Sequence, residues 1–437
     1  MERARGASKP GKALHEGYAV CAPGVEPLLA AELAPLGVRA IKGERGGVSF
    51  RATTRQLYAA NLWSRLATRV LVRVGTFEAN TFAELQRHAT ELDLERWLGD
   101  RPPYLRVSSQ RSALYHTDAI AERLHGVWGP PPEPPEPVTR RVGVAGTDRV
   151  ESGTADGKPD GRPAPTPDGD ELGDGPAGQL LVVRNVANRF TVSVDLSGAP
   201  LYQRGWRQEV GKAPLRENAA AAMLAAVGWQ APQPLLDPFC GSGTIVIEAA
   251  LAALGRPPGF LRGFAFFDWP IFEPGTWASV IGQAVDAERD PEGLGLQLVG
   301  SDRDAGVVVA AAANAERAAV AEWVTFEQRS VSDLPPWPGG GDRGWVLTNP
   351  PWGTRVSASR DLRNLYARFG DVLRTAVPTW SVGLLCADRH LAAHSGLSLQ
   401  ERLRFSAGGI DVALLTGRVG AATSGRRRPA GPRQPST

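Results

Sequence analysis

The sequence predicts an α/β protein with two folded units: a doubly wound, mainly parallel sheet in the C-terminal half and a smaller α+β region before it. The first observation is length, because 437 residues suit two or three domains of about 150 residues each. From about residue 213 onward, apolar segments typical of buried strands alternate with segments at helical spacing, as in parallel sheets covered on both faces. Two closely spaced apolar stretches at 401–406 and 409–419 then indicate an antiparallel hairpin at one edge.

Composition excludes several classes of protein. Hydrophobic residues make up 42% of the chain and charged residues 22%, which excludes full disorder. The three cysteines, Cys21, Cys240 and Cys386, lie far apart, so we expect a reducing compartment and no cysteine-built metal site. No apolar run approaches the roughly 20 residues that span a bilayer, and the charged start does not resemble a signal peptide. We therefore expect a cytoplasmic monomer with neither a metal nor a membrane contact.

One internal segment departs from this globular pattern. Residues 129–178 contain 10 Gly and 11 Pro among 50 residues, with scarcely any large apolar side chain, which predicts a disordered insertion. The two ends, 1–17 and 421–437, are also expected to be disordered, the second with a basic charge. The whole chain has a formal net charge of +3, so no folded part is expected to be strongly basic.

Residues 18–200 show two successive cycles of strands and helices. The first cycle, 18–76, predicts a small α+β unit, and the second, 77–200, continues on both sides of the insertion. We therefore expect the insertion to interrupt a domain and not to separate two. The expected elements are strands at 18–22, 46–52, 69–79 and 104–110, helices at 23–38, 53–66, 82–98 and 117–128, and a strand hairpin across 180–198.

A glycine-rich turn after the first strand of the C-terminal half is the strongest motif. The strand ends at Asp237, and Pro-Phe-Cys-Gly-Ser-Gly leads into a helix, so Gly241 and Gly243 let the backbone pass close beneath a ligand. Ligands of such sheets bind at the carboxyl ends of the strands. A nicotinamide dehydrogenase would need Gly or Ala where this chain has Val246, and the Gly-Lys-Ser/Thr of a P-loop does not occur.

The next strand ends in an acidic residue. Asp302 is placed to accept hydrogen bonds from ribose hydroxyls, a feature shared by many nucleoside-binding proteins. Asp304 is a competing candidate, and a helix N-cap is the alternative interpretation of either residue.

A later strand is followed by the motif that indicates the reaction. In Asn349-Pro350-Pro351-Trp352 the two prolines fix a rigid turn that directs neighbouring carbonyls outward. Side-chain and backbone oxygens can then hold an exocyclic amine by its two protons, while Trp352 offers a face for stacking a planar base.

These motifs resemble those of S-adenosylmethionine-dependent amino-methyltransferases. The segment Asp-Pro-Phe-Cys-Gly-Ser-Gly-Thr at 237–244 is similar to their motif I, and Asn-Pro-Pro-Trp at 349–352 to their motif IV. Leu-Tyr-Gln-Arg-Gly-Trp-Arg at 201–207, Ala-Pro-Leu-Arg-Glu-Asn at 213–218 and the residues around Asn349 resemble more closely the THUMP-domain RNA guanine-N2 methyltransferases, which modify rRNA or tRNA. The resemblance covers about 18–420 apart from the insertion.

The resemblance implies a fold and a set of site residues. The fold is a Rossmann-like class I methyltransferase domain at 201–420, with a mainly parallel seven-stranded sheet, after a ferredoxin-like region at 18–76 and a THUMP-like RNA-binding region at 77–200. The residues implied to contact S-adenosylmethionine are Asp237, Phe239, Gly241 and Gly243 around the loop, Asp302 at the ribose and Asp333 at the adenine amino group. The residues implied to hold the target guanine are Asn349, Pro350, Pro351 and Trp352.

The implied activity is methyl transfer to the exocyclic N2 amine of a guanosine in structured RNA, either rRNA or tRNA. The target base must be unpaired or flipped out of its helix. Family members usually have Tyr or Phe at the position of Trp352, so stacking is kept and the pocket size changes. The alternatives are an adenine-N6 or protein-glutamine methyltransferase, and a catalytically silent RNA-binding assembly factor.

Overall fold

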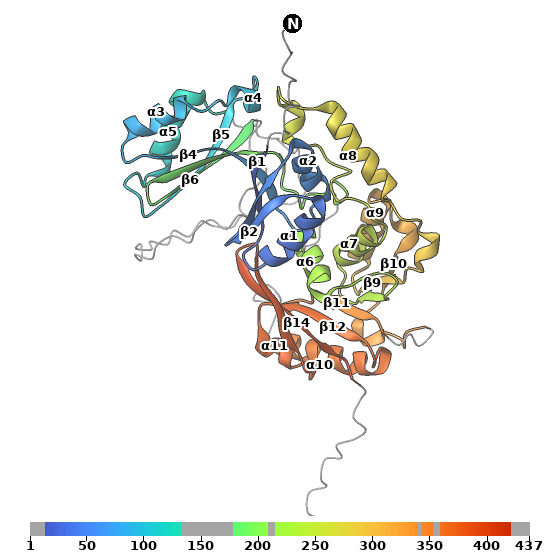
Figure 1. Cartoon of the computed structure of the whole chain (residues 1–437). Helices are drawn as coiled ribbons and strands as arrows, with labels where there is room; N and C mark the ends of the chain where they lie inside the picture. The colour runs from blue at the N-terminus through green and yellow to red at the C-terminus, as the bar shows by residue number, and fades with distance from the viewer. Residues whose placement is uncertain (1–13, 133–177, 209–214, 339–342, 353–358, 421–437) are drawn as a thin grey trace, which may run out of the picture.

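The computed structural model describes residues 14–132, 178–208, 215–338, 343–352 and 359–420. Within them the chain forms two seven-stranded sheets, one after the other in sequence (Figure 1). The predicted disorder of the termini and of the insertion falls largely on 1–13, 133–177 and 421–437, which lie outside the described residues. The first strand begins at His15, three residues before the expected start of the folded region.

The N-terminal sheet joins the two predicted cycles into one layer, in the order β2-β3-β1-β4-β7-β6-β5. Its strands are β1 (His15–Val20), β2 (Arg39–Glu44), β3 (Gly47–Ala52), β4 (Arg69–Glu78), β5 (Pro103–Gln110), β6 (Gln179–Val186) and β7 (Arg189–Asp195). Strand β4 pairs with both β1 and β7, so it belongs to both cycles. Strands β5 and β6 pair in parallel across the insertion, which confirms that the insertion interrupts a sheet.

Helices cover this sheet where the sequence predicts them, except that the single helix expected at 82–98 is interrupted at 91–94. They are α1 (Glu26–Leu33), α2 (Thr54–Trp63), α3 (Phe82–Thr90), α4 (Glu95–Leu98) and α5 (Thr117–Trp128). Capping boxes begin two of them, because Thr53 and Thr81 each accept a hydrogen bond from the backbone of the third helical residue, whose side chain bonds back. Strand β2 was not expected, since it is an edge strand without a buried residue and its sequence lacks an apolar face.

The C-terminal sheet has the order β10-β9-β8-β11-β12-β14-β13, which confirms the predicted mainly parallel sheet with an antiparallel edge hairpin. Its strands are β8 (Leu235–Asp237), β9 (Leu298–Asp302), β10 (Thr325–Gln328), β11 (Trp345–Thr348), β12 (Ser381–Cys386), β13 (Gln400–Ala407) and β14 (Ile410–Arg418). Strand β8 pairs with β9 on one side and with β11 on the other. The chain therefore adds strands first on one side of β8 and then on the other, and the strand order reverses at β8. Such a reversal is where doubly wound sheets bind ligands.

Helices flank this sheet on both faces, with α6 and α7 on one side and α10 and α11 on the other (Figure 1). The helices are α6 (Glu217–Val227), α7 (Thr244–Ala253), α8 (Pro274–Asp286), α9 (Ala305–Arg317), α10 (Ser359–Ala376) and α11 (Arg389–Ala393). Helix α8 was not expected and packs beside α2 of the N-terminal unit.

The two units share one hydrophobic core. A single cluster of buried side chains runs from Leu29 and Val48 in the N-terminal sheet to Ile247 and Leu298 in the C-terminal sheet. Buried apolar surface stabilises folding roughly in proportion to its area, so a shared core couples the two units. The turn between β1 and α1 also sits directly on β13, where a side chain at Gly24 would collide with the carbonyl oxygen of Arg404.

Candidate active site

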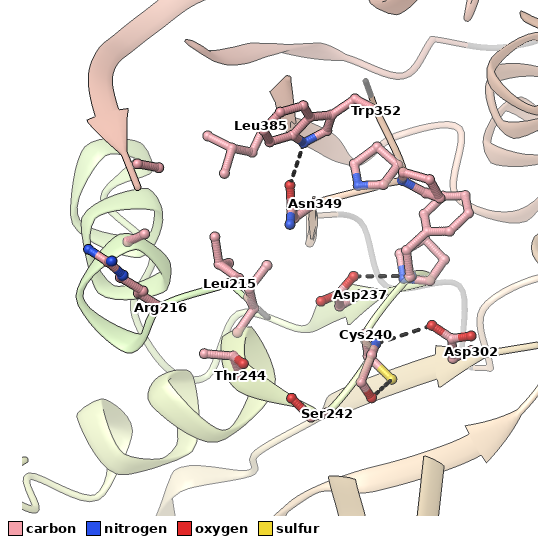
Figure 2. A pocket seen from close by; sticks show the side chains of 18 of the residues that line it. Leu215, Arg216, Asp237, Cys240, Ser242, Thr244, Asp302, Asn349, Trp352 and Leu385 are labelled. Carbon is pink, nitrogen blue, oxygen red and sulfur yellow. Dashed lines mark hydrogen bonds between the residues drawn. The ribbon is translucent and has the colours of Figure 1, made fainter. Parts of the chain in front are cut away.

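A cavity of about 1700 Å³ lies where β8, β9, β11 and β12 end (Figure 2). Single small-molecule pockets usually measure about 300–1,000 Å³, so this cavity has room for more than one ligand. Most of its walls come from the C-terminal sheet, and Ala22, Val25 and Leu66 of the N-terminal unit close one side.

Asp237 forms the floor of the cavity at the end of β8. Its Oδ1 accepts a hydrogen bond from the hydroxyl of Thr348, at 2.6 Å, and one from the backbone N–H of Phe239, at 3.1 Å. Burial raises the pKa of Asp237 to about 7, and the nearby Asp302 adds to the rise while the two hydrogen bonds oppose it. A cationic group bound beside Asp237 would stabilise its charged form.

The glycine loop passes under the cavity as the sequence predicts. Gly241 has a φ of 49°, a Cβ there would point into open space, and its N–H donates to Oδ2 of Asp302 at 3.2 Å. Gly243 has a φ of 85° and begins α7, but it does not line the cavity, because it faces the ring of Phe326. The two glycines therefore differ in position: Gly241 borders the cavity, and Gly243 packs against Phe326.

The three acidic candidates, Asp302, Asp304 and Asp333, differ in their position relative to the cavity. Asp302 lines the cavity, and its Oδ1 accepts from the N–H of Asp304 at 3.1 Å. Asp304 also borders the cavity, and it caps α9 by accepting from Gly306 N at 2.8 Å, so the helix-cap interpretation is confirmed for this residue. Asp333 is exposed and does not line the cavity, whereas its neighbours Val331 and Ser332 do.

The turn after β11 brings Asn349, Pro350, Pro351 and Trp352 onto the cavity wall. The indole N–H of Trp352 donates to Oδ1 of Asn349 at 2.9 Å (Figure 2). The buried Tyr366 of α10 donates its hydroxyl to the carbonyl of Pro351 at 3.3 Å. Burial raises the pKa of Tyr366, so this phenol stays a donor.

Cys240 has no nucleophilic role in this geometry. Burial raises the pKa of its thiol, and the carboxylates of Asp237 and Asp302 raise it further. The thiol therefore stays protonated beside the loop.

The structure also adds residues that the motifs did not reveal. Thr348 and Tyr366 hold the two ends of the Asn-Pro-Pro-Trp turn, and Leu385, at the end of β12, lies beside Trp352 (Figure 2). Thr348 directly precedes Asn349, so its position after an apolar strand was a usable signal. Tyr366 lies on another helix, and nothing in its local sequence links it to the turn.

Two arginines of the 201–207 segment are structural. Arg204 is buried and pairs with Glu248 of α7 at 3.2 Å. Arg207 pairs with Glu217 at 2.9 Å and donates to the hydroxyl of Thr244 at 2.7 Å. These bonds fix the starts of α6 and α7 beside the cavity.

Within the described residues, no three His, Cys, Asp or Glu side chains are grouped so that they could hold a metal ion. No helix among them has the length and apolar character needed to cross a membrane.

Sequence comparison places both halves of the chain. Residues 204–412 match the family described as the RMKL-like methyltransferase domain, and residues 16–71 match the RlmL ferredoxin-like domain. The Ribosomal RNA large subunit methyltransferase K/L of Shewanella amazonensis is 31% identical over 408 residues, which are 91% of this chain and 52% of that protein. The chain thus spans about half the length of this relative.

Other relatives match nearly from end to end. A Synechocystis protein named "Putative RNA methyltransferase slr0064" is 30% identical over 403 residues, covering 91% of this chain and 95% of its own. The crystal structure of SMU.472 complexed with SAH has a TM-score of 0.73 and 26% identity, with 94% of this chain and 100% of that chain covered. A Listeria monocytogenes protein titled "a predicted N6-adenine-specific DNA methylase" has a TM-score of 0.72 and 30% identity, with 92% and 96% covered. With residues 16–71 and 204–412 matched by family models and a relative aligned over almost its full length, the chain belongs to the family of RMKL-like methyltransferases.

Proposed function

We propose that this protein transfers a methyl group from S-adenosylmethionine to the exocyclic N2 amine of a guanosine in rRNA or tRNA. One observation carries the proposal: the Asn349–Trp352 turn and the glycine loop with Asp302 face the same cavity. An amine acceptor and a nucleoside-binding loop thus share one space. The RNA methyltransferase names of two relatives support RNA as the substrate.

The residues of the cavity fit the cofactor. Asp237 offers a buried carboxylate for its ammonium group, Gly241 leaves the space above the loop open, and Asp302 offers acceptors for ribose hydroxyls. When bound, S-adenosylmethionine supplies a methyl group that its sulfonium already activates. The protein then has to align the two reactants, an effect of proximity and orientation.

The turn after β11 orients the target amine. The Asn349 side-chain oxygen and a backbone carbonyl of the turn accept its two protons, which points the nitrogen lone pair away from the turn. Trp352 provides an indole face on which the base can stack, and Leu385 lies beside the indole (Figure 2). The base has to leave its helix to enter the cavity.

Two other functions remain as alternatives. Adenine-N6 methylation would use the same acceptors, and the name of the Listeria relative favours it as the second candidate. A silent RNA-binding assembly factor would keep the fold and need no amine acceptor.

The experiment is nucleoside mass spectrometry of separated rRNA and tRNA from a strain that lacks the protein. Complementation with the wild type should restore one N2-methylguanosine, and Asn349→Ala should not, although the variant still binds S-adenosylhomocysteine. Restored N6-methyladenosine would overturn the guanine proposal in favour of adenine. If no modified nucleoside depends on the protein, or if Asn349→Ala restores it, the enzymatic proposal fails.

A further inference from the structure

The hydrogen bond between Trp352 and Asn349 joins the two side chains that the proposed function uses for the target base. The indole Nε1–H donates to Oδ1 of Asn349 at 2.9 Å across the two prolines (Figure 2). An indole nitrogen is a donor only, so the bond is made to the oxygen that an amine would need. The indole N–H thus occupies the place that the proposed function gives to a proton of the target amine.

This bond and base stacking exclude each other on geometric grounds. A hydrogen bond prefers an angle above 150° at the proton, so an indole N–H that donates well has Oδ1 close to the plane of its own ring. An amine that donates to the same Oδ1 places that atom close to the plane of the target base. Stacked rings lie in parallel planes about 3.5 Å apart, so one oxygen cannot lie in both. The indole must give up Asn349 before it stacks.

Hydrogen bonds hold the part of the turn that precedes the indole. Thr348, before the turn, is bonded to Asp237, and the Pro351 carbonyl is bonded to the buried Tyr366. Trp352 itself is half-buried and lines the cavity. The backbone before the indole is therefore anchored, while the side chain borders open space.

Resting on the proposed function, we infer that Trp352 is a latch that closes the amine acceptor of Asn349 until a target base displaces it. The latched indole opens only for a planar base that supplies both an amine for Asn349 and a face for stacking. A base that offers one of these does not replace the interactions lost, so the latch selects amino-bearing bases. Trp352 sets specificity by competing for Asn349, and Phe or Tyr at this position would lack the competing N–H.

The test removes the N–H and keeps the ring. An analogue of the protein with benzothienylalanine at position 352 has sulfur in place of the indole nitrogen, and Trp352→Phe removes the donor with a smaller ring. Methyl transfer from tritiated S-adenosylmethionine to rRNA of the deletion strain gives KM and kcat. We expect the analogue to lower KM for rRNA about fivefold, the factor of one ordinary hydrogen bond, with kcat within twofold.

A second tryptophan provides the matched control. Trp337 also donates its indole N–H to a side-chain amide, Oε1 of Gln297 at 3.3 Å, and it lies outside the cavity. Trp337→Phe should leave KM and kcat unchanged. A lower KM in the sulfur analogue supports the latch, because loss of a purely structural bond cannot tighten substrate binding. A KM that is unchanged or raised overturns the latch.

A measurement without turnover separates the latch from the proposed function. The indole N–H resonance of Trp352, identified by its loss in Trp352→Phe, should exchange slowly with solvent in the protein bound to S-adenosylhomocysteine. Rapid exchange overturns the latch. Slow exchange in a wild-type protein that methylates no guanine leaves the latch standing and overturns the proposed function alone.

Discussion

The two sheets have the same number of strands but reveal their roles to different degrees. In the C-terminal sheet, Asp237 and Asp302 end parallel strands and Asn349 directly follows one, so the topology gathers the three residues at one edge. In the N-terminal sheet most neighbours are antiparallel, and its contribution to the cavity is apolar, through Ala22, Val25 and Leu66. Polar cavity residues at strand ends leave recognisable motifs in a sequence, whereas apolar cavity walls from a second unit do not.

A buried contact joins the two units and links the N-terminal wall of the cavity to the C-terminal sheet. Arg204 and Glu248 pair at 3.2 Å with side chains 1% and 0% exposed, and Arg65 of the N-terminal unit approaches the same carboxylate at 3.5 Å. Arg204 also donates to the carbonyl of Arg65 at 2.6 Å. If these bonds hold the N-terminal wall in place, the units act as one site.

Removing the shared carboxylate should have the largest effect. Glu248→Ala leaves the buried guanidinium of Arg204 and the largely buried one of Arg65 without their carboxylate, and breaking a buried pair in this way costs about 3–5 kcal/mol. Burial already lowers the pKa of Arg65, and Glu248 opposes that shift. Thermal and urea unfolding should show the loss. Two separate transitions in the wild type would contradict the view that the units are coupled.

The pH dependence of cofactor binding tests the C-terminal half by itself. Because the pKa of Asp237 is raised to about 7, its carboxyl is neutral below that pH and cannot pair with an ammonium group. Affinity for S-adenosylhomocysteine should therefore fall as pH drops below about 7, approaching tenfold per pH unit, and level off above it. Calorimetric titration from pH 5.5 to 8.5 measures this dependence.

The variant Asp237→Asn provides the comparison for that titration. It should bind the cofactor about tenfold more weakly at pH 8 and show little dependence on pH. The stability of the ligand-free protein should depend on pH in the opposite direction to cofactor affinity. The folded state holds this proton more tightly than the unfolded state, so stability should fall as pH rises from about 4 to 7 in the wild type and not in the variant. A wild-type affinity independent of pH would contradict pairing at Asp237.

The sequence predicted the C-terminal fold well because strand ends and glycine turns are local features. It also placed the Asn349–Trp352 turn and the glycine loop on one site. Two predicted residues do not line the cavity: Asp333 is exposed while Val331 and Ser332 of the same short helix border the cavity, and Gly243 faces the ring of Phe326. Tyr366 could not be predicted, because its bond to Pro351 depends on how α10 packs against the sheet.

In the N-terminal half the strand and helix succession was predictable, but its fusion into one sheet was not. Strand β4 pairs with β1 of the first cycle and with β7 of the second. The pairing of β5 with β6 across the insertion is long-range and has no local signal in the sequence. The contact between the β1–α1 turn and β13 could not be predicted either. Its only sign in the sequence is a glycine, which allows two backbone segments to approach closely.

The contact of the β1–α1 turn with β13 can be disturbed at Gly24. Gly24→Ala adds a side chain at a φ of 101°, against the carbonyl of Arg404, and should cost about 1–3 kcal/mol. The shifted turn carries Ala22 and Val25, so KM for RNA should rise while affinity for S-adenosylhomocysteine stays unchanged. Gly46→Ala is the matched control, with a φ of 86° and nothing within 4 Å of the new side chain. Equal kinetic effects in both variants would show that the N-terminal wall does not contact the substrate.

The smallest effect is expected at an exposed bridge between the same two units. Arg101 of the N-terminal unit pairs with Asp268 at 2.8 Å, with side chains 32% and 61% exposed. Exposed pairs contribute about 0–1 kcal/mol, since water screens the charges. The adjacent rings of Trp97 and Trp269, 4.9 Å apart, remain in Arg101→Ala and keep the contact packed. Urea unfolding of Arg101→Ala should therefore change by under about 1 kcal/mol, whereas a loss as large as that of Glu248→Ala would mean that surface charge, and not the buried network, joins the units.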